Sequence, residues 1–235
     1  MQIFAYLRHS HHLYYVVMNR PVSWFCKIFV KPIIDGFLIK EVRGLENIPK
    51  TNFILAANHE SHLDWILSGY VCVPRRFTYI GQVDSYRGLL MLGRVILYFI
   101  AGVIPINRKN EDSKKRAIDE AVKAIKKGDI VVIYPEGTRS RSGEIGKGKL
   151  GAAKIYFKTG VPILPLGIKG TFELMPAGKS FPKFKKSTEI TIGKPLYFRE
   201  EFEKAKKLDC HLEEYKNLLQ KITAQVMEEI TNLSK

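Results

Sequence analysis

The sequence contains little cysteine and no long apolar run. Its three cysteines, Cys26, Cys72 and Cys210, are odd in number and far apart in a chain of 235 residues. This spacing argues against a disulfide framework, suits a reducing compartment and offers no cysteine pair for a zinc site. No stretch of about 20 apolar residues is free of charge, so no transmembrane helix is predicted. We do not expect the amino terminus to be a signal peptide either, because its charges follow the first apolar stretch and no cleavage site of small residues is evident.

Acidic residues are scarce relative to basic ones. The chain carries 23 Asp and Glu against 38 Lys and Arg, which gives a net charge of +15. Such an excess predicts a polyanionic partner: nucleic acid, an anionic membrane surface or phosphorylated substrates. The rest of the composition is ordinary for a folded protein, with 46% hydrophobic residues. The length suits one domain with an appendage.

Residues 1–39 differ from the rest and are predicted to form a two-helix membrane-anchoring motif. Pro21 suits the first turn of the second helix, whose few polar residues recur at every fourth position from Ser23 to Asp35. On a helix this spacing makes one narrow polar stripe on an otherwise apolar cylinder, which Pro32 would bend or interrupt. The helices either pack on the core or form a hairpin that lies in one leaflet of a membrane, and the broad apolar surface favours the hairpin. The predicted membrane contacts are Trp24, Phe25, Lys27, Phe29 and Lys31.

Residues 40–235 are predicted to form an α/β domain. Strands alternate with helices, which is typical of a mixed, mostly parallel sheet flanked by helices on both faces. Expected strands cover residues 38–42, 53–57, 77–80, 102–108, 130–134, 161–168, 189–192 and 196–198. Expected helices cover residues 65–70, 86–99, 112–128, 151–158 and 212–230, with Asp112 or Ser113 capping the third. The first strand is expected at an edge and 53–57 at the centre. The strand that contains prolines is expected near an edge, because proline lacks an amide hydrogen.

His59 and Asp64 form the first candidate site. His59 follows the buried strand, which is where α/β folds place their chemistry, and Asp64 lies five residues further on. A turn can fold the Asp64 carboxylate onto one imidazole nitrogen and leave the other as an acceptor, the arrangement of a general base. Most such pairs are surface residues or helix caps, so the spacing alone does not decide. A metal site of His59, His62 and Asp64 is a weaker alternative, because the two histidines are one residue too close for the HExxH spacing.

The second candidate site is the loop after residues 130–134. Gly137 allows close approach of a ligand to the backbone, and Thr138 offers a hydroxyl. Arg139 offers a planar fork that matches phosphate, and Glu136 could orient an arginine or a ligand hydroxyl. Arg108 follows another predicted strand and is expected at the same rim. The alternative is a solvated basic loop, which we favour for Arg141 and the lysines beyond it.

These motifs resemble those of the glycerolipid acyltransferase family. Asn58 to Asp64 is similar to its NHx4D block, and three further segments resemble its second, third and fourth blocks in the right order. These three segments are residues 102–108, 134–139 and 161–166. The resemblance covers roughly residues 40 to 200 and is closest to bacterial-type 1-acyl-sn-glycerol-3-phosphate acyltransferases. One departure is Gln82, near which many members carry a lysine, so we assign Gln82 no role.

The resemblance implies a reaction and its partners. A thioester of coenzyme A or acyl carrier protein would donate an acyl group to the 2-hydroxyl of lysophosphatidic acid, giving phosphatidic acid without a cofactor, a metal or a covalent acyl-enzyme. His59 would take the hydroxyl proton and Asp64 would hold the imidazole. Arg139, the backbone of Glu136 to Thr138, and Arg108 would hold the glycerol phosphate, and residues 86–99 would border a channel for the donor chain. The resemblance also implies a peripheral or monotopic protein on the cytoplasmic face of the cell membrane.

Three rival hypotheses remain open at this point. A sister enzyme would acylate glycerol 3-phosphate or another lysolipid with the same dyad. A non-enzymatic basic membrane-binding module would account for the charge and the hairpin, but not for paired motifs at two strand ends. A nucleic-acid binder is disfavoured, because the basic residues form no aromatic-interleaved motif and the amino terminus is apolar.

Overall fold

A seven-stranded sheet organises the part of the chain that the computed structural model describes, residues 20–82, 102–176, 181, 183 and 185–235. Its strand order is β1-β7-β6-β2-β5-β3-β4, and every pair is parallel except β6 with β7. The predicted mixed, mostly parallel sheet is therefore confirmed, with β1 at an edge and β2 at the centre. The strands are β1 Ile39–Arg43, β2 Ile54–Ala57, β3 Phe77–Gly81, β4 Val103–Pro105, β5 Ile130–Ile133, β6 Ile163–Lys169 and β7 Thr188–Ile192.

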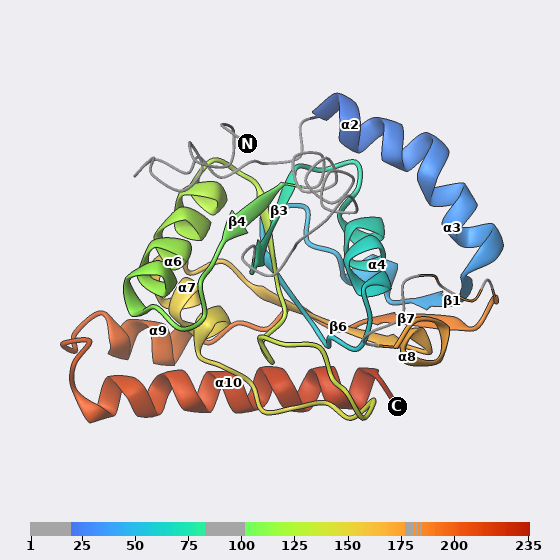
Figure 1. Ribbon diagram of the computed structural model, residues 1–235. Coiled ribbons are helices and arrows are strands. Elements are labelled where there is room, and N and C mark those ends of the chain that lie inside the picture. Colours follow the sequence, from blue (N-terminus) through green and yellow to red (C-terminus); the bar gives the residue numbers. More distant parts are fainter. Residues whose placement is uncertain (1–19, 83–101, 177–180, 182, 184) are drawn as a thin grey trace, which may run out of the picture.

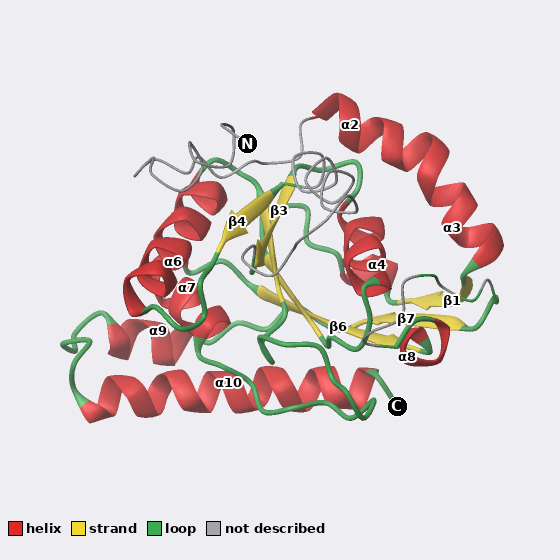
Figure 2. Ribbon diagram, viewed as in Figure 1, coloured by secondary structure: helices red, strands yellow, loops and turns green. Residues whose placement is uncertain are grey.

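Helices cover both faces of the sheet (Figures 1 and 2). Side chains alternate along β2, so that Leu55 joins a cluster with α4 while Ile54 and Ala56 join a cluster with α6, α7 and α10. A strand buried on both faces has to be apolar throughout, which explains the unbroken run of residues 53–57. The helical elements are α2 Arg20–Phe25, η1 Cys26–Val30, α3 Lys31–Phe37, η2 Leu45–Asn47, α4 Leu63–Cys72, α6 Glu111–Lys126, α7 Gly151–Thr159, α8 Thr171–Leu174, α9 Arg199–Ala205 and α10 Glu213–Leu233.

The predicted position of the prolyl strand was wrong. β6 lies inside the sheet, between β7 and β2. Pro165 is tolerated there because the ladder with β7 starts one residue later, at Leu166, so the missing amide hydrogen removes no bond from that ladder. The Pro165 carbonyl oxygen still accepts a hydrogen bond from the backbone N–H of Gly193, at 2.9 Å.

Three other local predictions are corrected or untested. Residues 196–198, expected to form a strand, form none; Leu196 makes only an isolated bridge with Ile163. The cap of α6 is Asn110, whose side-chain oxygen accepts the backbone N–H of Ser113, rather than Asp112 or Ser113. The helix predicted over residues 86–99 lies outside the described residues.

The helical segment formed by α2, η1 and α3 turns its polar stripe toward the protein. Ser23 Oγ donates to the Arg75 carbonyl oxygen at 2.9 Å. Lys31 Nζ lies 3.9 Å from the centre of the Tyr70 ring, and the Tyr70 hydroxyl donates to Asp35 at 2.7 Å. Lys31 therefore contacts the domain, contrary to its predicted place among the membrane contacts. The first helix of the predicted hairpin falls in residues 1–19, outside the described residues.

The opposite side of the same segment is an exposed apolar row. Its six large side chains are each 50 to 59% exposed, although nothing in their chemistry favours water. They are Trp24, Phe25, Ile28, Phe29, Ile33 and Phe37. Lys27, which was also predicted to contact a membrane, is exposed beside Trp24, with its Nζ 4.9 Å from the indole ring. Across the described ranges, no helix has the combined length and apolar character that crossing a membrane requires.

Candidate active site

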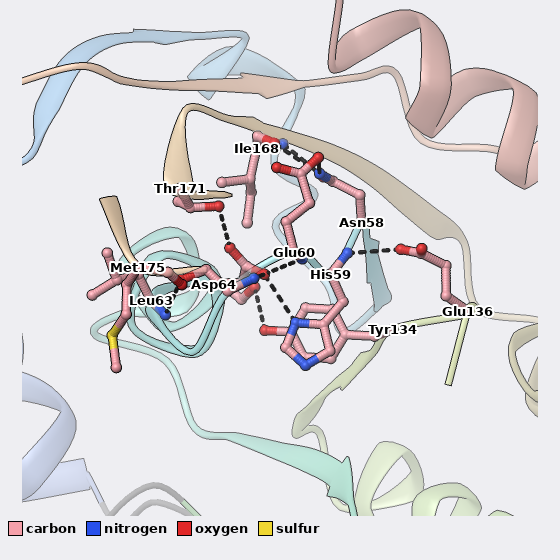
Figure 3. Close-up of polar contacts among 12 residues, drawn as sticks. Asn58, His59, Glu60, Leu63, Asp64, Tyr134, Glu136, Ile168, Thr171 and Met175 are labelled. Carbon is pink, nitrogen blue, oxygen red and sulfur yellow. Dashed lines mark hydrogen bonds and ion pairs between the residues drawn. The ribbon is translucent and has the colours of Figure 1, made fainter. Parts of the chain in front are cut away.

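His59 and Asp64 meet where the β2 chain turns into α4 (Figure 3). His59 Nδ1 lies 2.9 Å from Asp64 Oδ2, and both side chains are buried or nearly so. The strand end is fixed by Asn58, whose side-chain oxygen accepts the Ile168 N–H at 2.8 Å and whose amide donates to the Ile168 carbonyl at 2.7 Å. Asn58 thus extends the pairing of β2 with β6 by one residue, and the chain can turn directly after it.

The contacts of Asp64 determine which nitrogen of His59 carries a proton. Asp64 Oδ2 also accepts the backbone N–H groups of Glu60 and Ser61, both at 2.7 Å, and Oδ1 accepts the Thr171 hydroxyl at 2.7 Å. Backbone N–H groups can only donate, so the carboxylate is held as an acceptor and His59 Nδ1 must be the donor. Nε2 is then an unprotonated acceptor, and it makes no hydrogen bond within the described ranges. The predicted general-base geometry is present.

Two contacts from the loop that follows β5 hold His59 in place. The Tyr134 ring stacks on the imidazole, with centroids 4.1 Å apart and planes 17° apart. The Ser140 N–H donates to the His59 carbonyl oxygen at 2.7 Å. The Tyr134 hydroxyl is anchored 3.0 Å from Ser68 Oγ on α4, so the ring cannot easily swing away. The sequence predicts no role for Tyr134 or Thr171, because their spacing in the chain does not report these contacts, and for Ser140 it offers only a hydroxyl rather than this backbone contact.

Glu136 has a structural task that its sequence context did not suggest. Its Oε1 accepts the His59 N–H at 2.7 Å and its Oε2 accepts the Gly146 N–H at 2.9 Å. Burial raises the pKa of this carboxyl, while the two backbone hydrogen bonds oppose that shift. Both oxygens are therefore engaged, and Glu136 does not line the cavity. The structure places it as a residue that positions the loop against the dyad rather than as the predicted substrate contact.

A cavity of about 840 Å³ opens beside the dyad. His59 lines it together with two of the predicted binding residues, Arg108 and Gly137. Thr138 and Arg139 do not line it. Arg139 is nevertheless adjacent to Ser140, which bonds the His59 carbonyl, and its Nη1 is buried with no hydrogen-bond partner among the described residues. A buried donor left unpaired costs about 1–3 kcal/mol, so this guanidinium is suited to receive an anion.

Lys149 is a site residue that the sequence prediction missed. Its backbone N–H donates to the Pro135 carbonyl oxygen at 2.8 Å, and this hydrogen bond holds Lys149 beside the loop that follows β5. Its Nζ lies close to Gly137, because a Cβ built on that glycine would be 2.8 Å from it. Gly137 also has a φ of 68°, so a side chain there would be both strained and blocked. The sequence favours a solvated loop for the lysines beyond Arg141, and the signal that could single out Lys149 is its place just before α7.

Glu60 is the unusual carboxyl of the site. It is 9% exposed and accepts a hydrogen bond from the Asn58 amide at 3.2 Å. Burial, followed by the negative charge of Asp64, raises its pKa from 4.5 to about 7. A carboxyl with this pKa is partly protonated at neutral pH, whereas Asp64, with its three hydrogen-bond donors in addition to His59, is held as an acceptor.

Among the residues that the structure describes, one group of side chains could hold a metal ion, and it is not the trio of His59, His62 and Asp64. Asp209, Cys210 and His211 place their ligand atoms within 4.8 Å of one another, and all three residues are exposed. Exposed groups of this kind are common without an ion, so we assign them no metal.

All three cysteines of the chain are free, in agreement with the expectation from their spacing.

Comparison with known proteins agrees with this fold and site. A family model described as Acyltransferase matches residues 40–169. A chloroplastic 1-acyl-sn-glycerol-3-phosphate acyltransferase from Brassica napus is 31% identical over 73% of this chain and 49% of its own length. A 1-acyl-sn-glycerol-3-phosphate acyltransferase from Borreliella burgdorferi is 35% identical over 55% of this chain and 51% of its own. The chain thus spans about half the length of these curated relatives.

A solved structure has the same overall arrangement. The crystal structure of the 1-acyl-sn-glycerophosphate acyltransferase PlsC from Thermotoga maritima matches with a TM-score of 0.56 and 25% identity. The match covers 97% of this chain and 87% of that one. The fold and the site together define an α/β protein with a buried histidine–aspartate pair at the carboxyl end of a central strand. Because the family model matches more than half of its length, the chain belongs to the Acyltransferase family.

Proposed function

We propose that this protein transfers an acyl group from a thioester to the 2-hydroxyl of 1-acyl-sn-glycerol 3-phosphate, and so makes phosphatidic acid. One observation carries the proposal. The His59 imidazole, oriented by the Asp64 carboxylate, lines a cavity that several basic side chains also line. The names of the curated relatives support the same acceptor. A thioester is already activated, so the protein has to position the two substrates and remove one proton.

The proton is taken by His59 Nε2. As the hydroxyl oxygen attacks the thioester carbonyl, its proton moves to Nε2 and the imidazole becomes a cation. Asp64 stabilises this cation through the 2.9 Å contact with Nδ1, and stays a carboxylate because two backbone N–H groups and the Thr171 hydroxyl also donate to it. The same proton then goes to the departing thiolate, which returns the base to its starting state.

The acceptor phosphate is bound at the rim next to Gly137. Arg108 and Lys149 line the cavity, Lys149 Nζ lies beside Gly137, and the buried Arg139 nitrogen belongs to the same loop as Gly137. Guanidinium forks and an ammonium are the side chains best suited to a phosphate. Gly137 contributes by leaving room: any side chain at this position would occupy the place of Lys149 Nζ.

The acceptor is a membrane lipid, so the protein works at a membrane surface. The exposed apolar row on α2, η1 and α3 is the contact that we propose, together with Lys27. Large apolar side chains gain free energy when they leave water for the headgroup boundary, and a lysine near the surface gains about 1 kcal/mol from anionic lipids. In this arrangement the protein is peripheral or monotopic and lies on the cytoplasmic face of the cell membrane.

The test is to identify the product. Purified protein is mixed with 1-acyl-sn-glycerol 3-phosphate and a panel of acyl-CoA and acyl-carrier-protein donors, and lipids are identified by mass spectrometry. We expect phosphatidic acid from the wild type and none above background from His59→Ala. Glycerol 3-phosphate and other lysolipids serve as rival acceptors. Preferred acylation of one of these would replace the proposal with a sister activity, and transfer to none of them would reject it.

A further inference from the structure

Helix α4 supports His59 from two directions. Asp64 and Ser68 are four residues apart on this helix, so they lie on the same side of it, and both are fully buried. Asp64 contacts the edge of the imidazole at Nδ1, whereas Ser68 reaches the face of the imidazole through the Tyr134 ring. We propose that Tyr134, held by Ser68, is a positioning residue whose ring face stabilises the imidazolium that His59 becomes on taking a proton. This inference rests on the proposed function for the source of that proton.

The sheet brings the two rings together. β2 and β5 are parallel neighbours, so their carboxyl ends meet at one edge of the sheet. His59 lies two residues after β2, and Tyr134 is the first residue after β5. The ring centroids are 4.1 Å apart and the ring planes differ by 17°, so the imidazole lies on the face of the Tyr134 ring and not at its edge (Figure 3). Both residues are only 7% exposed, so little water can replace this contact.

The face of an aromatic ring attracts a positive charge. The π-system is negative on its face, and its attraction for a cation increases where water is excluded. Burial raises the pKa of the Tyr134 hydroxyl well above its ordinary value, so the ring itself stays neutral. A neutral imidazole gains little from such a face, whereas an imidazolium gains more. The contact therefore becomes stronger as the proton is transferred, and only interactions that strengthen in this way accelerate a reaction.

Ser68 holds the ring in this position. The Tyr134 hydroxyl lies 3.0 Å from Ser68 Oγ, and Ser68 is 0% exposed. A buried hydroxyl without a partner is costly, so both hydroxyl groups favour the arrangement in which they meet. Because Asp64 lies one turn earlier on the same helix, α4 fixes the edge and the face of the imidazole together.

Charged groups also act on the imidazole from the other elements around it. Carboxylates attract an imidazolium and basic side chains repel it, so each of them affects how readily His59 takes a proton. A replacement of Tyr134 by another neutral residue changes none of these charges, and its effect can be assigned to the ring. The charged groups are Asp64 of α4, Glu60 of the turn before α4, Glu136 of the loop after β5, and basic side chains of the cavity such as Arg108 and Lys149.

The experiment changes the electrostatics of the ring while keeping its shape. Tyr134 is replaced by phenylalanine, by pentafluorophenylalanine, whose fluorine atoms withdraw negative charge from the ring face, and by leucine, which has no ring. The first measurement is the acid limb of the pH profile of kcat/KM, which reports protonation of the base in the free enzyme. The second is the midpoint of protonation of the His59 side chain by NMR, which requires no turnover.

Tyr79 is the matched control. It is 2% exposed on β3, the strand next to β5, and its hydroxyl also donates to α4, at the Trp65 carbonyl oxygen. Its ring stacks on Trp65 and not on His59. Tyr79→Leu should lower the melting temperature, as the loss of any buried ring does, and should leave the acid limb in place.

We expect Tyr134→Leu and the pentafluorophenylalanine variant to move the acid limb and the NMR midpoint toward lower pH by about 0.5 to 1 pH unit. A cation–π contact of this kind changes an equilibrium constant about three- to tenfold, and kcat should fall by about the same factor. Tyr134→Phe keeps the ring face, so it should keep the wild-type limb and midpoint and lose at most about threefold in kcat. Ser68→Ala should match Tyr134→Phe, and the double variant should be no worse than either, because both changes remove the same contact.

A Tyr134→Leu enzyme with a lower kcat but an unmoved acid limb and midpoint would reduce Tyr134 to a space-filling role and reject the inference. A pentafluorophenylalanine variant that behaves like Tyr134→Phe would reject it as well. If Tyr134→Leu proves unfolded by circular dichroism, the two variants that keep the ring decide between these outcomes. A wild type that acylates no lysolipid would reject the proposed function, whereas the NMR midpoints would still decide whether the ring stabilises the imidazolium.

Discussion

The dyad and the basic rim of the cavity differ in how completely their polar groups are paired. At the dyad, Asp64 receives four hydrogen-bond donors, Glu136 receives two backbone N–H groups, and Asn58 is bonded on both sides of its amide. At the rim, a buried Arg139 nitrogen and the side-chain ammonium groups of Lys115 and Lys154 have no hydrogen-bond or ion-pair partner in the described part of the chain. The polar groups of the dyad thus find their partners within the protein, whereas the rim carries unpaired positive charge.

The difference corresponds to two tasks. A general base has to be held in one orientation before the substrate arrives, because any reorganisation during the reaction adds to the barrier. A binding surface gains affinity when its charges find their partners only in the complex. Because the polar groups of the dyad are fully hydrogen-bonded, we expect mutations there to lower the reaction rate. Because the rim carries unpaired positive charge, we expect mutations there to lower the affinity for substrate. The predictions below test this division, beginning with the largest effect.

Removing the base should have the greatest effect. His59→Ala should lower kcat by about 10² to 10⁴, the usual contribution of a positioned base, and leave KM for both substrates near its wild-type value. Asp64→Asn should also lose most activity, since an amide cannot accept from all the donors that now surround Asp64. Steady-state kinetics with both substrates varied gives the two constants.

His62→Ala is the control for this loss, because His62 is a histidine of the same loop outside the dyad. We expect it to change kcat by less than tenfold. A His59→Ala enzyme that turns over normally, or a native enzyme that a chelator inactivates, would contradict the mechanism.

The sequence predicted the dyad better than it predicted its surroundings. His59 and Asp64 are close in the chain, and a turn after a buried strand brings them together with little help. Thr171 and Lys149 reach the site from other segments, and only the tertiary fold reports that. Pro165 was misplaced for the same reason, because whether a strand lies inside a sheet depends on its neighbours.

The amphipathic pattern of residues 22–39 shows a related limit. The spacing of Ser23, Lys27, Lys31 and Asp35 correctly indicated a helix with a polar stripe. The spacing could not tell which side of the helix faces the domain. A periodic pattern separates a polar face from an apolar face, but it does not say which of the two packs against the protein. In the structure the polar stripe packs inward, so Lys31 is used internally and the apolar side chains are left outside.

Changes at the rim should affect affinity instead of rate. Arg139→Ala should raise the KM for the phosphorylated acceptor about 10-fold to 100-fold, the equivalent of roughly 1.5–3 kcal/mol for a charge-assisted contact, and change kcat little. Arg139→Lys should recover only part of this, because an ammonium lacks the planar fork. Arg141→Ala is the matched control, since Arg141 is exposed in the same loop. An Arg139→Ala enzyme whose KM for acceptor and donor are both unchanged would exclude Arg139 from the site.

The exposed apolar row should affect activity only where the substrate is in a membrane. Changing Phe25, Phe29 and Phe37 to Ser should weaken binding to anionic vesicles and lower activity on vesicle-embedded acceptor several-fold, with activity on detergent-dispersed acceptor retained. Point changes are preferable to deletion of residues 1–39, because Ile34 and Ile39 are 7% and 5% exposed and belong to the core. The melting temperature of the triple variant should stay near that of the wild type.

A second triple variant controls for the loss of exposed apolar surface in general. Leu45, Tyr197 and Leu212 are 48 to 54% exposed and lie outside this helical segment. Their change to Ser should leave vesicle binding unaltered. Equal losses from both triple variants would show that the α2–α3 side is not the membrane contact.

The smallest effect concerns Glu60, the member of the dyad region whose charge is least well accommodated. Burial and then Asp64 raise its pKa from 4.5 to about 7, so between these two values the folded state holds a proton that the unfolded state has released. Its contribution to stability is therefore fully present below pH 4.5 and is lost as the pH rises through 7. Glu60→Gln stays neutral at every pH and should escape this loss. We expect the melting temperature of Glu60→Gln, relative to wild type, to rise by a few degrees between pH 5 and pH 8. Glu144→Gln, the same chemical change at an exposed position, should show no such trend. Parallel melting curves for Glu60→Gln and wild type would mean that the dyad region tolerates this charge, and that its pairing is more complete than the raised pKa implies.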